Sequence, residues 1–117
     1  HMTGGTLRHN DRDVVGTDTL HFFEKFYASY AIVGAGALDA AKGVLDFSYS
    51  EAQTTSTLIA NSRTTFLVAD TSKWARNASV RVVPFNKVTS LFTDAIPDKA
   101  AGQALAEAGI EVVLCDD

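Results

Sequence analysis

The sequence of 117 residues contains little cysteine and no long apolar stretch, and each absence excludes a class of protein. Cys115 is the single cysteine, so an intrachain disulfide is impossible and a reducing compartment, the cytoplasm, is expected. Apolar runs stay below the roughly 18 residues that a membrane span needs, and there is no signal-peptide pattern. We interpret Cys115 as a residue at the end of a terminal strand, with a reactive thiol as the alternative.

A cluster of positive charge is also missing. The ten Lys and Arg residues are scattered, and the formal net charge is -4. Domains that bind nucleic acid usually present a basic stripe, so the chain is not expected to bind DNA by itself. His9 and His21 have no metal-ligand spacing, and the glycines form neither a phosphate loop nor a dinucleotide fingerprint. Neither a metal nor a cofactor is therefore expected.

What the chain does have is an alternation of short apolar runs and helical patterns. The apolar runs predict buried strands over residues 30–33, 65–69, 90–93 and 110–114. Helices are predicted over residues 17–26, 50–61 and 97–108, with Ser50 as an N-cap and Gly109 as a stop signal. Residues 80–83 are predicted as a shorter strand or an irregular piece, and residues 34–47 as a loop.

Apolar strands that alternate with helices are typical of parallel sheets with both faces covered. With right-handed crossovers they predict one α/β domain, Rossmann-like and three-layered, with a mostly parallel sheet. Ligands of such sheets bind beyond the carboxyl ends of the strands. The segments that follow the predicted strands are therefore the first places to look for a site.

Two candidate segments follow predicted strands. Gly34 and Gly36 offer backbone N–H groups and room for a ligand to approach, although a tight turn explains them equally well. Asp70, Ser72 and Lys73 combine a carboxylate, a hydroxyl and an ammonium within four residues. Asp70 could accept hydrogen bonds from ligand hydroxyls and Lys73 could meet a phosphate, while the alternative is a surface salt bridge with a helix cap.

The third candidate segment lies near the start of the chain and contains Gly4, Gly5 and Arg8. A glycine pair can expose N–H groups to an anion and Arg8 could clamp a phosphate, while the alternative is a hairpin-like turn with solvated charges. Glu51 is a possible general base. It is also an ordinary first-turn carboxylate that favours the helix dipole.

Taken in order, these pieces resemble the C-terminal sensor domain of the DeoR family of bacterial repressors. The similarity covers residues 3–117, and the motifs are specific as a group. The matching residues are Gly4-Gly5-x-Leu7-Arg8, Val15-Gly16, Gly34-x-Gly36, Gly43, Glu51, Val68-x-Asp70-x-Ser72-Lys73 and Thr93-Asp94.

The resemblance implies a fold similar to ribose-5-phosphate isomerase-like folds and a role in sensing. A phosphorylated sugar or polyol effector would bind the sensor and lower the operator affinity of a separate winged helix-turn-helix domain. Operator DNA would then be contacted only through that second domain. The implied ligand-binding residues are Gly4, Gly5, Arg8, Gly34, Gly36, Glu51, Asp70, Ser72 and Lys73.

Departures from the family pattern carry further expectations. The family's first strand and its Gly-Thr-Thr loop have no counterpart here, and His1-Met2 resembles a tag remnant. We therefore expect residues 3–117 to be the C-terminal part of an N-terminally truncated sensor domain, without the winged helix. An exposed sheet edge would then favour a homo-oligomer. Thr55-Ser56 stands where the family often has a Lys-Arg pair, and Trp74 stands where Phe or Ile is usual.

Two other functions compete with this prediction. One is a sugar-phosphate isomerase-like enzyme that uses Glu51, Asp70 and Lys73, because proton abstraction beside a carbonyl needs a base and a nearby cation. The other is a dimerisation domain that binds no ligand. The order of the motifs favours the repressor sensor.

Overall fold

The structure is a computed structural model that describes residues 6–7, 14–15 and 28–115, with side chains from residue 30 onward. The helix predicted over residues 17–26 lies outside the described residues, as do Gly4, Gly5 and Arg8. Near the start of the chain, β1 (Thr6–Leu7) and β2 (Val14–Val15) pair antiparallel.

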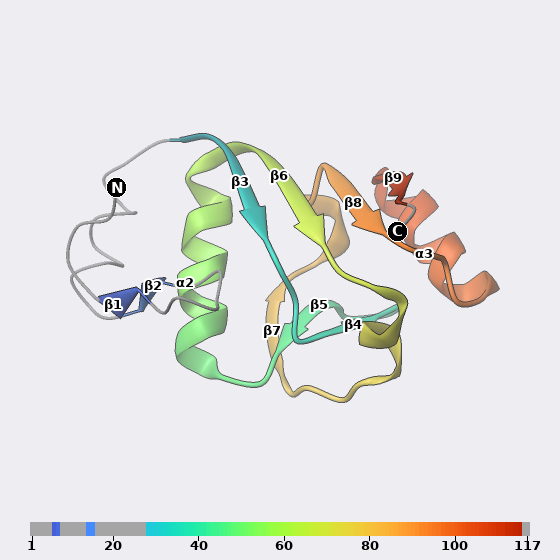
Figure 1. The fold of residues 1–117 in the computed structure, drawn as a ribbon, viewed down its shortest axis with the longest axis horizontal. Helices are drawn as coiled ribbons and strands as arrows, with labels where there is room; N and C mark the ends of the chain where they lie inside the picture. Colours follow the sequence, from blue (N-terminus) through green and yellow to red (C-terminus); the bar gives the residue numbers. More distant parts are fainter. Residues whose placement is uncertain (1–5, 8–13, 16–27, 116–117) are drawn as a thin grey trace.

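The largest sheet of the described residues is a parallel sheet of four strands (Figure 1). Its strands cover the four predicted apolar runs except for Ala69 and Ile110, which lie just outside β6 and β9. The predicted α/β fold with a mostly parallel sheet is thus confirmed. In spatial order the strands are β3 (Ala28–Val33), β6 (Ser62–Val68), β8 (Ser90–Thr93) and β9 (Glu111–Leu114).

Two long helices connect the strands, α2 (Tyr49–Ala60) and α3 (Lys99–Ala108). The N-cap prediction for α2 is wrong, because the hydroxyl of Ser48, and not that of Ser50, accepts the N–H of Glu51 at 3.3 Å. Ser48 has the extended backbone that an N-cap requires, whereas Ser50 already lies in the first turn. Helix α3 ends as predicted, with Gly109 in the left-handed conformation at φ 78°.

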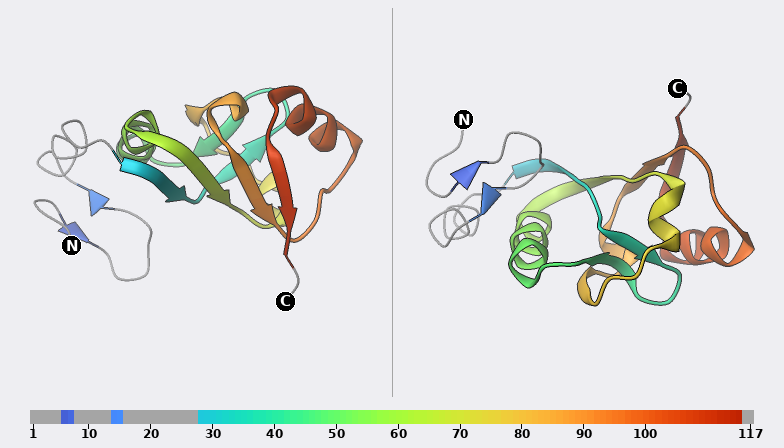
Figure 2. Two further views of the ribbon diagram at one scale, coloured as in Figure 1. Left: turned by 90° about the horizontal axis from the view of Figure 1, so that it is seen from above. Right: turned by 60° about the horizontal axis from the view of Figure 1, so that its bottom comes forward.

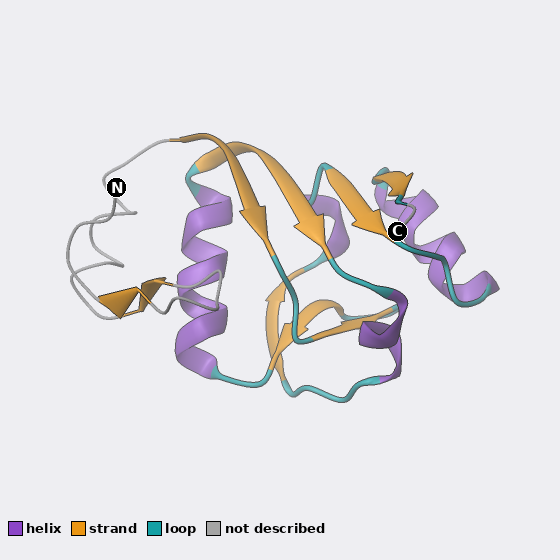
Figure 3. Ribbon diagram, viewed as in Figure 1, coloured by secondary structure: helices purple, strands orange, loops and turns teal. Residues whose placement is uncertain are grey.

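The prediction of a loop over residues 34–47 is wrong (Figure 3). This segment contains β4 (Ala37–Asp39) and β5 (Gly43–Asp46), which form an antiparallel sheet with β7 (Val80–Val83). The turn is closed by Asp39, whose carboxylate accepts the N–H groups of Ala41 and Lys42 at 2.9 and 2.7 Å. Gly43 follows at φ 94°, where a Cβ would lie 2.7 Å from a backbone oxygen of Val83. Two short 3-10 helices, η1 (Thr71–Ala75) and η2 (Phe85–Lys87), complete the described elements.

The core lies on one side of the parallel sheet. Leu67 and Leu91 point into it and are fully buried beside Leu105 of α3. Figure 2 (left) shows α2, α3 and the β4-β5-β7 sheet on that same side. The described residues therefore form two of the three predicted layers.

The opposite face of the parallel sheet is exposed within the described residues. Tyr30, Ile32 and Val68 are 60%, 62% and 52% exposed. The Phe66 ring lies 6.1 Å from that of Tyr30 and 5.7 Å from that of Phe92, measured between centroids. An apolar stripe thus crosses three neighbouring strands. None of the described helices is long and apolar enough to cross a membrane.

Candidate functional site

The carboxyl ends of the parallel strands bring several polar residues to one edge of the sheet. Gly34 follows β3, Asp70 follows β6, Asp94 follows β8 and Cys115 follows β9. The η1 helix, which begins just after Asp70, packs against β4, which begins just after Gly36. Two of the three predicted segments are therefore neighbours, and we call this region the carboxyl edge.

Asp70 is the N-cap of η1. Its carboxylate accepts the N–H of Ser72 at 2.9 Å and also the Ser72 hydroxyl. These two hydrogen bonds, followed by the positive charge of Lys73, hold the pKa of Asp70 below its ordinary value of 3.8. The helix-cap part of the alternative interpretation is therefore observed. One oxygen, Oδ1, makes both bonds to Ser72.

Asp94 ties the η1 loop to the neighbouring strand. Its carboxylate accepts the N–H of Thr71 at 2.8 Å and the Thr71 hydroxyl, and these bonds hold its pKa below the ordinary 3.8. Asp94 belongs to a motif of the resemblance but, like Thr71, was not one of the predicted site residues. The position of Asp94 directly after a buried strand was the signal that could have found it.

A cavity of about 290 Å³ opens at this edge between the ends of β6 and β8. Asp70, Lys73 and Asp94 line it, together with Thr93, the exposed Cys115 and the apolar residues Val68, Ala69 and Phe92. The carboxylates can accept hydrogen bonds from hydroxyl groups, and Lys73 can meet an anion as a point charge. No group of three or more His, Cys, Asp or Glu side chains within the described residues is arranged to hold a metal ion.

The glycine segment is held mainly by its own packing. The N–H of Gly36 donates to the carbonyl of Leu45 at 3.0 Å, so it is already paired. A Cβ on Gly36 would lie 3.0 Å from the Phe47 ring and 3.2 Å from Cα of Asp46. These contacts favour the tight-turn interpretation of Gly36. Gly34 is partly exposed between β3 and β4.

Glu51 lies in the first turn of α2, beside the Ser48 cap. This position fits a carboxylate that favours the positive end of the helix dipole. Helix α2 packs along β6 and β7. Glu51 is thus on a different element from the Asp70 loop.

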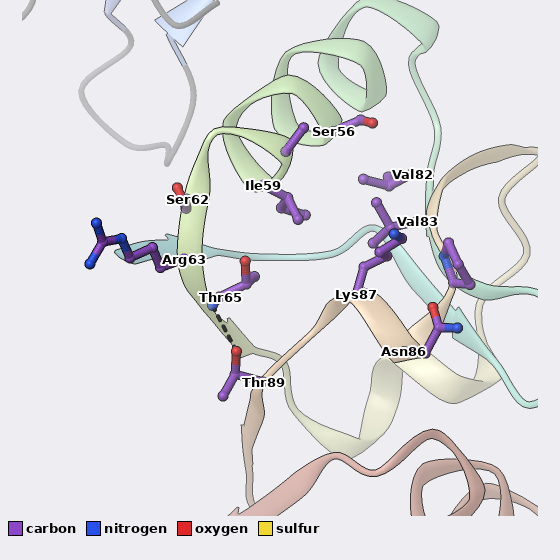
Figure 4. A pocket seen from close by; sticks show the side chains of 12 residues that line it. Ser56, Ile59, Ser62, Arg63, Thr65, Val82, Val83, Asn86, Lys87 and Thr89 are labelled. Atoms are coloured by element: carbon purple, nitrogen blue, oxygen red, sulfur yellow. Dashed lines mark hydrogen bonds between the residues drawn. The ribbon is translucent and has the colours of Figure 1, made fainter. Parts of the chain in front are cut away.

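A second and larger cavity, of about 600 Å³, lies at the opposite edge of the parallel sheet, where β6 and β8 begin (Figure 4). We call this region the amino edge. The predicted site residues within the described part of the chain do not line it. Its lining residues are Ser56, Ile59, Ala60, Ser62, Arg63, Thr65, Val82, Val83, Pro84, Asn86, Lys87 and Thr89.

Comparison with known proteins finds consistent similarity. A family model described as the DeoR C terminal sensor domain matches residues 1–95. The chain is 36% identical to the glycerol-3-phosphate regulon repressor of Escherichia coli over 97% of its own length and 45% of the repressor. It is 38% identical to the Haemophilus influenzae protein of the same name, over 98% of the chain and 44% of that protein.

A third relative is the HTH-type transcriptional repressor CsqR of Escherichia coli, which is 33% identical over 97% of the chain and 43% of the repressor. The chain therefore spans less than half the length of these three relatives.

Proposed function

The chain belongs to the family of DeoR C-terminal sensor domains, and from this membership we propose that it senses a phosphorylated sugar or polyol for a bacterial transcriptional repressor. The effector binds at the carboxyl edge and lowers the operator affinity of a separate helix-turn-helix domain. The observation that carries this proposal is the cavity of about 290 Å³ that Asp70, Lys73 and Asp94 line. The names of the relatives make glycerol-3-phosphate the first effector to test.

The charges of the cavity suggest how such an effector is oriented. Asp70 and Asp94 would repel a phosphate, but both carboxylates accept hydrogen bonds from the hydroxyl groups of a polyol. Lys73 supplies the one cation among the residues that line this cavity. We therefore assign the hydroxyl end of the effector to Asp70 and Asp94, and the phosphate to Lys73 together with Gly4, Gly5 and Arg8.

The remaining predicted residues have smaller parts in this proposal. Ser72 holds Asp70 in place through its N–H and hydroxyl. Gly34 leaves room beside the loop, Gly36 fixes the entry into β4, and Glu51 stabilises the first turn of α2. Release of the operator is a population shift, in which the effector binds the arrangement without operator affinity more tightly.

Binding is tested by titrating the chain with glycerol-3-phosphate and recording amide NMR signals. The signals of residues 70–73 and of Asp94 are expected to shift in a saturable way, whereas free glycerol leaves them unchanged. Lys73→Met removes the cation and is expected to weaken binding by about tenfold or more. Lys42→Met, an exposed lysine in the β4–β5 turn, is the matched control and should bind normally.

Two results would contradict the proposal. Absence of any saturable shift with every phosphorylated polyol or sugar tested excludes the carboxyl edge as the effector site. Aldose–ketose turnover that depends on Glu51, Asp70 and Lys73 would instead support the isomerase-like alternative.

We also propose that the domain self-associates through the exposed face of the parallel sheet. Tyr30, Ile32 and Val68 give this face an apolar character that monomers rarely leave uncovered, and β3 is an edge strand among the described residues. Light scattering is expected to give a mass above that of the monomer, and Ile32→Glu is expected to reduce it to the monomer. A monomeric parent chain would contradict this assembly.

A further inference from the structure

The amino-edge cavity is built from four elements and combines an apolar wall with polar groups. Ile59 of α2 and Val82 and Val83 of β7 are buried and supply the apolar wall. Thr65 of β6 lies across the cavity from the two valines, and the side chain of Lys87 of η2 extends beside Val83 (Figure 4). Pockets for small molecules usually show this combination of apolar surface and a few convergent polar groups.

Two of the polar groups in this cavity have no partner within the described residues. Thr65 is 2% exposed, and its hydroxyl, which Figure 4 shows directed toward Ile59, makes no hydrogen bond there. The bond drawn between Thr65 and Thr89 instead joins the Thr65 N–H to the Thr89 hydroxyl at 3.0 Å. The ammonium of Lys87, also directed inward in Figure 4, forms no ion pair with the described residues.

The Thr65 hydroxyl opens onto the cavity, where a ligand group could form a hydrogen bond with it. By contrast, the hydroxyl of Ser62 in the same cavity is already used, because it donates to the carbonyl of Leu58 at 2.8 Å. The Thr65 hydroxyl is thus available on the buried wall of the cavity, while Asn86 and Lys87 are exposed residues that line it as well.

The charges around the cavity favour a single negative charge on the ligand. Lys87 points into it, whereas Figure 4 shows Arg63 directed away. The C-terminal turn of α2, which ends at Ala60, adds the negative end of a helix dipole beside the cavity. A phosphate dianion would bring two negative charges next to this negative helix end, and the Lys87 ammonium would neutralise only one of them. A carboxylate carries a single negative charge, which Lys87 neutralises.

We propose that the amino-edge cavity is a second ligand site, which binds a small organic monocarboxylate that carries a hydroxyl group and a short apolar chain. The carboxylate pairs with Lys87, the hydroxyl bonds to Thr65, and the apolar chain packs against Ile59 and Val82. This site is independent of the proposed effector site, because it lies at the other edge of the sheet and uses different residues.

The test uses 3-hydroxybutyrate as the probe and amide NMR signals of the chain as the readout. The signals of Thr65, Asn86, Lys87 and Thr89 are expected to shift in a saturable way, while those of residues 70–73 stay in place. Butyrate, which lacks the hydroxyl, is expected to bind several-fold more weakly. 1,3-Butanediol, which lacks the carboxylate, is expected to cause no saturable shift.

Matched variants separate the two contacts. Lys87→Met is expected to weaken 3-hydroxybutyrate binding by about tenfold or more, whereas Lys99→Met, on the exposed start of α3, leaves it unchanged. Thr65→Val is expected to lower the affinity for 3-hydroxybutyrate to that for butyrate, without changing the affinity for butyrate itself. Thr65→Ser should restore the difference.

The proposal is overturned if 3-hydroxybutyrate gives no saturable shift, or if Lys87→Met binds it as well as the parent chain. It is equally overturned if the shifts appear at residues 70–73 and not at Thr65. Spectra of each variant without the probe establish that the fold is kept.

Discussion

The two edges of the parallel sheet differ in whether their polar side chains are already hydrogen-bonded. At the carboxyl edge, the carboxylates of Asp70 and Asp94 already accept hydrogen bonds from Ser72 and Thr71. At the amino edge, the hydroxyl of Thr65 and the ammonium of Lys87 face a cavity about twice as large and find no partner among the described residues. The carboxyl edge is thus organised before any ligand binds, while the amino edge offers a hydroxyl and an ammonium with which a ligand could form hydrogen bonds.

This difference follows from the local sequence at each edge. Asp-Thr-Ser directly after a strand forms a capped turn, because a carboxylate readily accepts the N–H two residues ahead. Thr65 lies within β6, where its backbone is committed to the sheet and its hydroxyl reaches no neighbouring N–H. Preorganised groups suit the orientation of a specific effector, since the loop loses little entropy on binding.

The largest expected effect is that of Leu67→Ala, which tests whether the two edges depend on the same packed core. Leu67 is fully buried between them, and Leu67→Ala is expected to lower the free energy of unfolding by about 3 kcal/mol through loss of packing and formation of a void. Denaturant unfolding measures this change. The amide signals of both edges should broaden or shift together, since they share the core.

Val68→Ala is the matched control for Leu67→Ala. Val68 is the next residue of β6 but points to the exposed face, with 52% of its surface accessible. Its truncation is expected to cost about 0.5 kcal/mol or less in a monomer. A cost as large as that of Leu67→Ala would indicate that Val68 is buried in solution, as the self-association proposed above would bury it.

Much of the fold could be predicted from the sequence, because buried parallel strands produce continuous apolar runs. Residues 30–33 and 90–93 show this directly, and Gly109 ends α3 as its position predicts. The β4–β5 hairpin was missed, because its strands are short and the glycines and aspartates around them are typical of loops. Only the tertiary contact between Gly43 and Val83 shows why a strand pair forms there.

The candidate site was predictable where a residue follows a strand, and not elsewhere. Asp70 and Lys73 follow a predicted strand, and ligands of parallel sheets bind beyond the carboxyl ends of the strands, so both residues could be placed at the carboxyl edge. The sequence does not show that Thr71 bonds to Asp94, 23 residues later, because that contact depends on the order of β6 and β8 in the sheet. Likewise, Thr65 and Lys87 face one cavity only after β6 and η2 are placed in space.

The smallest expected effect is the change of amide NMR signals when the pH is lowered. It should be seen at the carboxyl edge and not at the amino edge. A carboxylate with a lower pKa in the folded than in the unfolded chain stabilises the fold above the unfolded value, near 3.8. That stabilisation is lost as the pH falls through the lower, folded value. Protonation of Asp94 weakens its bonds to Thr71, so the Thr71 amide signal is expected to titrate with a midpoint below 3.8.

The Ser72 amide should follow Asp70 in the same way, because the same kind of bond joins them. The Thr65 amide should not titrate, since the residues that line the amino-edge cavity include no Asp or Glu. Asp94→Asn is expected to flatten the Thr71 curve and leave that of Ser72 in place. A titration midpoint of the Thr71 amide at or above pH 3.8 would show that Asp94 does not hold the η1 loop in solution. The carboxyl edge would then not be organised before a ligand binds.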